Sequence, residues 1–217
     1  MGERFKPGAK DHPDMLGSFI RHGLTEDEAS GESLLQVMAG SDTSATTIRI
    51  VLLNLLTIPR AYRRLQQEID DAIAAGKISS PVKNTEGREL PYLQAVIKEA
   101  LRLRPPASGP FFKEVPPGGD VINGIFVPGG TQIGSSPLGI HHSKERFGGD
   151  AEHFRPERWL EETDADRLAS MSSTVDLVFH YGKYQCLGKP VAMMEFNKIF
   201  VEVRTMLSPT RLPRSLF

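Results

Sequence analysis

Apolar residues recur at helical spacing from Thr25 to Ile58, and this pattern constrains the fold more than any other feature of the chain. It begins at a capping box, Thr25-Glu26-Asp27-Glu28, in which the threonine hydroxyl and the Glu28 carboxylate each accept a backbone N–H at a helix start. At about 1.5 Å per residue, such a helix extends roughly 50 Å. We therefore expect residues 25–58 to form one long central helix with apolar side chains on more than one face.

The other segments predict a mainly α protein with a small β-sheet, built as a single partial domain over residues 1–217. Residues 1–24 read as an irregular lead-in in which only residues 15–21 could form a helical turn, and Pro59 starts a second helix over 60–75. The remaining expectations are a helix at 91–104, a small sheet and loops at 111–160, strands at 121–127 and 132–136 joined by a Pro-Gly turn, a cysteine loop and helix at 179–207, and a tail at 208–217 without a strand pattern.

Charge and cysteine content narrow the classes of function. The 26 basic and 27 acidic residues leave a net charge of -1, which gives no reason to expect a nucleic-acid partner. One cysteine excludes an internal disulfide and fits a reducing compartment. The start of the chain has no apolar signal region, and no apolar run is long enough to span a bilayer, so the chain as given is expected to be soluble and cytoplasmic.

The single cysteine, Cys186, lies in a loop that leads into a helix. Phe179 precedes it by seven positions, Gly182 precedes it by four, and Gly188 follows it by two. The partial positive charge at a helix start favours a thiolate over a thiol, and glycines let the backbone approach a flat ligand closely. Such a thiolate suits the axial position of haem iron, although a lone cysteine is more often a small buried apolar residue.

The middle of the long helix is built poorly for stability alone. Gly40 costs about 1 kcal/mol in a helix interior, and the serines and threonines around it compete for backbone carbonyls. One interpretation is a weak point or a close helix crossing. The other is that Gly40 leaves room for a flat ligand, beside which Asp42 and Thr43 supply an acid and a hydroxyl for proton transfer.

Two further patterns are weak when taken alone. Glu99 and Arg102 stand three apart on a helix, and most such pairs are exposed and contribute little. His141 and His142 invite comparison with a metal site, but neighbours in a strand point to opposite faces and no third ligand stands at a sensible spacing.

The pattern Phe-x-x-Gly-x-x-x-Cys-x-Gly of residues 179–188 resembles the haem-binding signature of the cytochrome P-450 family. Tyr184 replaces an arginine that reaches a haem propionate in that family, and the longer string through Pro190 is similar to the fungal branch that contains pisatin demethylase. The resemblance implies that Cys186 is the axial ligand of the iron, with Phe179, Gly182 and Gly188 shaping the loop around the haem. Lys113 stands where the family often places an arginine directed at a propionate.

The family's other motifs follow in the same order. Residues 39–44 match an Ala-Gly-x-Asp-Thr-Ser motif, which implies that Gly40 makes room for the haem while Asp42 and Thr43 deliver protons during the reaction with dioxygen. Glu99 and Arg102 match Glu-x-x-Arg, and Arg158 in Pro156-Glu157-Arg158-Trp159 is the third member of that set. The resemblance implies that these three residues form a structural lock behind the haem.

The resemblance implies a haem-thiolate monooxygenase that uses haem b to insert one oxygen atom from dioxygen into a small organic substrate, in fungal secondary metabolism. Electrons would come from an NADPH-dependent reductase, and a full-length member is expected at the endoplasmic reticulum membrane. The match extends over the C-terminal half of a family member, so the alternative is a truncated, non-catalytic family relic. Isomerisation without dioxygen is disfavoured by the intact Asp42–Thr43 pair.

Overall fold

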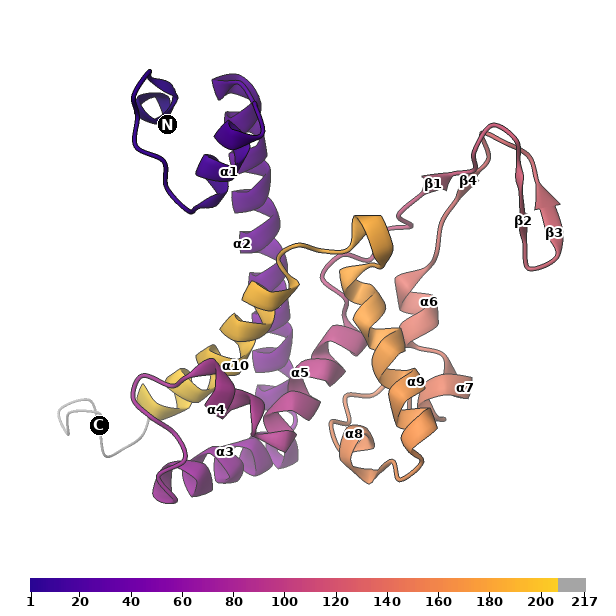
Figure 1. The fold of residues 1–217 in the computed structure, drawn as a ribbon. Coiled ribbons are helices and arrows are strands. Elements are labelled where there is room, and N and C mark those ends of the chain that lie inside the picture. Colours follow the sequence, from indigo (N-terminus) through magenta and orange to yellow (C-terminus); the bar gives the residue numbers. More distant parts are fainter. Residues whose placement is uncertain (207–217) are drawn as a thin grey trace. The chain divides into compact units, whose positions relative to one another are not determined.

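The computed structural model describes residues 1–206 of the 217-residue chain. It is mainly helical, with two short antiparallel strand pairs in the described part, as the sequence predicts (Figure 1). The α-helices are α1 Met15–Arg21, α2 Glu26–Thr57, α3 Pro59–Ala74, α4 Asn84–Arg88, α5 Pro91–Leu103, α6 Pro137–His141, α7 Lys144–Phe147, α8 Arg158–Glu161, α9 Ala165–Asp176 and α10 Lys189–Met206. Three short 3-10 helices are η1 Gly2–Phe5, η2 Leu177–Phe179 and η3 Gly182–Tyr184.

The chain forms two compact units, Met1–Ala45 and the part from Thr46 onward. The long helix α2 belongs to both, because it runs without interruption from Glu26 to Thr57. Its bounds lie within one residue at each end of the helix predicted at 25–58.

The first unit is held together by caps and ion pairs near its surface. The backbone N–H of Thr25 donates to Glu28 Oε2 at 2.8 Å, and that of Glu28 donates to Thr25 Oγ1 at 3.3 Å, so the predicted capping box is present. Asp14 caps α1 by accepting from the N–H of Gly17, and Arg4 donates to both of its carboxylate oxygens. The segment predicted as an irregular lead-in therefore contains η1 and α1 and has defined contacts.

Along α2 in this unit, four large apolar side chains are exposed: Leu34, Leu35, Val37 and Met38. Among the apolar side chains of α2 that the structure describes in this unit, Ala29 alone is fully buried. The apolar residues that define the predicted helix are thus mostly not covered here.

The second unit is built around α5, which is buried over most of its surface. Pro91 starts the helix, where a missing N–H costs nothing, and apolar residues on several faces pack against α3, α8, α9 and α10 (Figure 1). From α3, the residues Ala61, Leu65, Ile69 and Ala72 contribute a buried stripe at helical spacing. This packing fixes α5 as the frame on which charged groups of later segments converge.

The strand prediction is wrong in its pairing. Residues 121–127 form a hairpin and not one strand: β2 Asp120–Ile122 pairs with β3 Ile125–Val127 across Asn123-Gly124. Both turn residues have positive φ, 50° and 80°, as a type I′ turn requires, and Asn-Gly is the preferred pair for that turn. The other ladder joins β1 Lys113–Glu114 to β4 Gln132–Ile133. The segment at 132–133 therefore pairs with 113–114 and not with 121–127, and the β2–β3 hairpin lies between these two segments in the sequence.

The two adjacent histidines do not lie in a strand, contrary to the prediction. Ser136 caps a short helix that Pro137 begins, and His141 is its last residue, followed by His142 at the cap. The buried ring of His141 contacts the carbonyl of Thr174 through Nε2 at 3.0 Å, and Nε2 of His142 contacts that of Leu103 at 2.9 Å. Both rings therefore have backbone partners.

The last helix, α10, follows the cysteine loop as the sequence predicts and begins at Lys189, with Pro190 in its first turn. The predicted end of this helix at Leu207 and the predicted tail at 208–217 lie outside the described residues.

Candidate functional site

The most densely bonded charged cluster surrounds Glu99 on α5. Arg102 donates from Nε to Glu99 Oε2 at 3.0 Å and from Nη2 to Oε1 at 2.8 Å, while Arg158 donates from Nε to Oε1 at 2.9 Å. All three side chains are at most 2% exposed. Two guanidinium groups on one buried carboxylate leave a net positive charge, so further acceptors are needed.

Backbone carbonyls of the segment 141–153 supply those acceptors. Arg102 also donates to the carbonyls of His141, Ala151 and His153, and Arg158 donates to the carboxylate and the carbonyl of Asp150. The cluster therefore ties α5 to α8 and to the loop between α7 and α8.

Sequence reasoning missed two contributors to this cluster. The indole N–H of Trp159 donates to Glu99 Oε2 at 3.0 Å, and the backbone N–H of Arg155 donates to Oε1 at 2.9 Å. Trp159 stands next to Arg158 in the sequence, and a buried tryptophan needs a partner for its N–H, so this signal was available.

A second buried carboxylate, Glu157, lies next to this cluster in sequence. It accepts from the hydroxyl of Tyr92 at 2.9 Å and from Arg60 at 2.5 Å. Burial and the neighbouring carboxylate raise the pKa of Tyr92 above its usual range. The phenol therefore stays protonated and remains a donor, which links α5 to the residue that precedes α8.

The cysteine loop is anchored at its start and open at its end. Phe179 is buried in the core of the second unit, whereas Cys186 is exposed and its thiol is free. The backbone N–H of Cys186 donates to the carbonyl of Phe179 at 2.8 Å and closes the loop. Gly182 turns the chain inside it with a φ of 65°, in the left-handed region that favours glycine.

Two aromatic contacts join the stretch that enters β1 to this loop. The rings of Phe111 and His180 meet edge to face with centroids 4.3 Å apart. The ammonium of Lys113 lies 5.0 Å from the ring centroid of Tyr184, and that of Lys183 lies 5.8 Å from it. The structure thus brings Lys113 and Tyr184 together. The family resemblance predicts that Lys113 faces a haem carboxylate, and it places Tyr184 where the family has an arginine with that role.

The remaining predicted site residues lie on α2 in the first unit. Gly40 and Asp42 are exposed, and a Cβ atom added at Gly40 would meet nothing within 4 Å. The hydroxyl of Thr43 donates to the carbonyl of Ala39 at 2.7 Å, one turn earlier in the helix. The glycine therefore leaves open space beside an acid and an alcohol on one helical turn.

The residues of the cysteine loop fit a haem ligand. In the described residues no group of three His, Cys, Asp or Glu side chains could hold a metal ion. The loop offers one free thiol, and exposed apolar surface flanks it at Tyr181, Tyr184 and Leu187. A single sulfur ligand beside apolar surface and an ammonium suits a flat iron complex that carries carboxylates.

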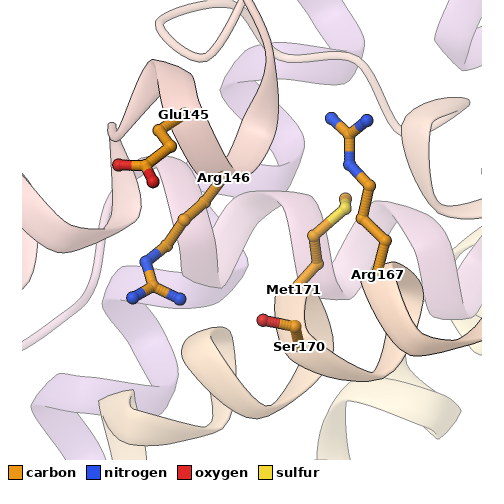
Figure 2. Close-up of a pocket in the computed structure, with 5 residues that line it drawn as sticks. All are labelled: Glu145, Arg146, Arg167, Ser170 and Met171. Atoms are coloured by element: carbon orange, nitrogen blue, oxygen red, sulfur yellow. The ribbon is translucent and has the colours of Figure 1, made fainter.

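A hollow of about 390 Å³ lies elsewhere in the second unit. Figure 2 shows its lining side chains, which come from α7 and α9: Glu145, Arg146, Arg167, Ser170 and Met171. Arg167 pairs with Glu162 at 3.1 Å, so its charge is already balanced. This charged hollow does not suit a large apolar ligand, and no residue of the cysteine loop lines it.

Comparison with known proteins decides the family. The family model for cytochrome P-450 matches residues 4–204 of the chain. The chain belongs to the cytochrome P-450 family. Its observed mainly helical fold with small antiparallel strand pairs is part of the cytochrome P-450 fold, as the sequence motifs predicted.

Fungal cytochrome P-450 monooxygenases are among the relatives. The chain is 50% identical over 204 residues to cytochrome P-450 monooxygenase ABA1 of Pyricularia oryzae, which covers 94% of this chain and 40% of the relative. It is 47% identical over 203 residues to cytochrome P-450 monooxygenase aba1 of Botryotinia fuckeliana, with the same coverage. It is 39% identical over 199 residues to cytochrome P-450 monooxygenase abl1 of Leptosphaeria maculans, which covers 92% of this chain and 35% of the relative.

The chain thus spans about 40% of the length of the first two of these curated relatives. Membership of the cytochrome P-450 family implies a haem cofactor, which the free thiol of Cys186 is suited to ligate. Within residues 1–206, no helix has the length and apolar character needed to cross a bilayer.

Proposed function

We propose that this chain is the haem-binding part of a monooxygenase that inserts one oxygen atom from dioxygen into a small organic substrate. The observation that carries the proposal is the free, exposed thiol of Cys186 at the end of a loop anchored by buried Phe179. A structural cysteine is usually buried, whereas a ligand must face the group that it binds. The fungal monooxygenases to which the chain is similar support the same function.

In this proposal the thiolate of Cys186 would hold the iron of haem b. Bound in this way, the haem supplies the activation of dioxygen. The hydrogen bond from Cys186 N–H to Phe179 holds the sulfur at the loop end, and Gly182 and Gly188 keep bulk away from the haem face. Lys113, whose ammonium lies over the ring of Tyr184, would hold a carboxylate of the haem.

Asp42 and Thr43 would move protons in the reaction. An acid and an alcohol can pass a proton only when both lie within hydrogen-bond reach of the reacting oxygen, and neighbouring positions on one helical turn are compatible with that need. Thr43 donates its hydroxyl hydrogen to Ala39 in the structure. To donate toward a substrate oxygen, the hydroxyl must rotate away from this carbonyl. Gly40 precedes Thr43 by about one helical turn, and its missing side chain would leave the room that the haem needs.

Glu99, Arg102 and Arg158 would act through structure and not through chemistry. Their side chains are buried and bonded to one another and to backbone carbonyls. In this proposal they hold the frame of the second unit behind the haem.

The reaction also requires electrons and a substrate. We propose an NADPH-dependent reductase as the electron donor, an endoplasmic reticulum location for the complete protein, and a role in fungal secondary metabolism. The fungal organisms and monooxygenase names of the relatives support the role in fungal metabolism and the need for an electron donor, and the reductase and the location are what the family resemblance implies.

A reduced carbon monoxide difference spectrum of the purified, haem-supplemented protein tests the proposal. A cysteine thiolate ligand moves the Soret band to the red, so we expect the shifted band in the unsubstituted protein and its loss in Cys186→Ala. Gln185→Ala is a matched control, because Gln185 is the exposed neighbour of Cys186 and its backbone bond to Gly182 is retained.

The same spectrum separates the two candidate functions. A spectrum without haem uptake, or a band without the thiolate shift, would leave the non-catalytic family relic as the interpretation. Either result in the unsubstituted protein would refute the monooxygenase proposal for this chain.

A further inference from the structure

Two lysines flank one exposed tyrosine ring on the cysteine loop. The Nζ atom of Lys113 lies 5.0 Å from the ring centroid of Tyr184, and that of Lys183 lies 5.8 Å from it. These distances are in the range of cation–π attraction, in which the negative face of the ring holds a cation. Lys183 is the sequence neighbour of Tyr184, but Lys113 comes from β1, so its contact depends on the tertiary fold.

A second contact keeps the same two segments together. Phe111 meets His180 edge to face, with ring centroids 4.3 Å apart and planes at 90°. Phe111 and Lys113 are two positions apart, the spacing at which side chains of an extended segment share one side. The stretch from 111 to 113 therefore lies along the cysteine loop and contacts it at alternate residues, which fixes the direction from which Lys113 approaches.

The two ammonium groups remain free to bind an anion. In the part of the chain that the structure describes, no carboxylate lies within ion-pair distance of Lys113 or Lys183. The ring of Tyr184 attracts the cation without neutralising it. The result is a positive charge that is held in place next to the loop of Cys186.

We propose that Tyr184 is a positioning residue for Lys113. Its ring holds the Lys113 ammonium beside the cysteine loop, and that ammonium receives a carboxylate of the haem. The inference rests on the proposed function, because it needs haem bound at Cys186. It divides between two residues the work that one arginine at position 184 would do: Lys113 carries the charge, and Tyr184 sets its position.

This division predicts that the two residues are coupled. Replacing Tyr184 by leucine frees the Lys113 side chain, so binding of the carboxylate must then order it. Replacing Lys113 by glutamine removes the charge that the ring positions in this proposal, and the cation that then remains over the ring is that of its sequence neighbour, Lys183. Tyr184→Phe keeps the ring face, so it should behave as the unsubstituted protein.

The rate of haem loss to an excess of apomyoglobin measures the coupling. We expect Tyr184→Leu and Lys113→Gln each to speed haem loss, Tyr184→Leu by about 2- to 5-fold, as expected for an exposed cation–π contact. The double variant should lose haem no faster than Lys113→Gln alone, and Tyr184→Phe should match the parent. Tyr181→Leu is the matched control, because Tyr181 is an exposed aromatic residue of the same loop, and no cation from residues 1–206 lies over its ring.

A second measurement examines the pair without haem. In the haem-free protein, the ring current of Tyr184 should move the side-chain NMR signals of Lys113 upfield. The shift should persist in Tyr184→Phe and disappear in Tyr184→Leu.

The possible results separate this inference from the proposed function. If the thiolate Soret band is present but Tyr184→Leu retains haem as the parent does, or adds independently to Lys113→Gln, the positioning role is overturned and the proposed function stands. An upfield shift that survives Tyr184→Leu also overturns it. If the unsubstituted protein shows no thiolate-ligated haem, the proposed function and this inference fail together.

Discussion

The Nε atom of Arg158 donates to Oε1 of Glu99 at 2.9 Å, and this bond joins residues that are 59 positions apart in the sequence. Both side chains are at most 2% exposed. Arg102 and Trp159 donate to the second oxygen of the same carboxylate. The carboxylate therefore compensates two buried guanidinium groups at once. Removing its charge would leave Arg102 without a carboxylate partner among the described residues, while Arg158 would keep its ion pair with Asp150.

Glu99→Gln should therefore destabilise the second unit by about 3–5 kcal/mol, the usual cost of removing one member of a buried ion pair. Urea unfolding followed by tryptophan fluorescence measures this directly. Trp159 is the single tryptophan of the chain and contacts Glu99, so its emission reports on this cluster.

Glu152→Gln provides the comparison for that measurement. Glu152 is exposed and lies in the loop between α7 and α8, so the same chemical change there should alter the free energy of unfolding by less than about 0.5 kcal/mol. Similar effects of the two substitutions would show that the Glu99 cluster contributes no more than a surface charge.

His141 should make the stability depend on pH below neutrality. Burial lowers its pKa, and the charges of Arg102 and His142 act in the same direction, while the bond to the Thr174 carbonyl opposes them. The folded state then binds the proton less tightly than the unfolded state. The contribution of neutral His141 to the free energy of unfolding is therefore complete above the unfolded pKa of about 6.5. This contribution is lost as the pH falls below that value, by at most about 1.4 kcal/mol per pH unit.

Urea unfolding between pH 7.5 and pH 5 measures this dependence. His141→Gln removes the titration, so its free energy of unfolding should change less over this range than that of the parent. His153→Gln should keep the parent's dependence, because the His153 side chain is exposed. Parallel curves for the parent and His141→Gln would rule out a role for His141.

The two glycines of the cysteine loop should respond differently to alanine. Gly182 has a φ of 65°, which costs an L-residue about 1–2 kcal/mol, so Gly182→Ala should lower the free energy of unfolding of the second unit by about that amount. At Gly188 an added Cβ would lie 3.7 Å from the Cys186 sulfur, an ordinary contact, and Gly188→Ala should leave the haem-free protein within about 0.5 kcal/mol of the parent. Thermal unfolding of both variants checks this, and equal losses would mean that the strain at 182 is not the cause.

Much of the helical structure could be predicted, because its signals are local. The capping box at Thr25 and the prolines that open α3 and α5 act within a few residues of the boundary that they set. The predicted strand at 121–127 failed for a local reason too. Asn123-Gly124 is a strong turn signal inside an apolar run, and it outweighs the continuity of the run.

The candidate site could be predicted only as separate pieces. The spacing of the cysteine loop pointed to Cys186, and the family resemblance pointed to Lys113 and Tyr184 one at a time. The contact between Lys113 and Tyr184 appeared only in the structure. Adjacency of Trp159 to Arg158 indicated that its indole N–H needs a partner near this cluster, but only the structure shows that the partner is Glu99.

The sequence by itself determined where the helices run and which residues carry charge, thiol and hydroxyl chemistry, because periodicity, caps and motifs are properties of neighbouring residues. Only the tertiary structure decided which of these groups meet. Glu99 can accept from Arg158, and Lys113 can lie over Tyr184, only after burial of the apolar faces around α5 has brought distant segments together. The hydrophobic effect that drives such packing is non-directional, so it does not specify which residues meet. The shape of the whole unit decides those contacts.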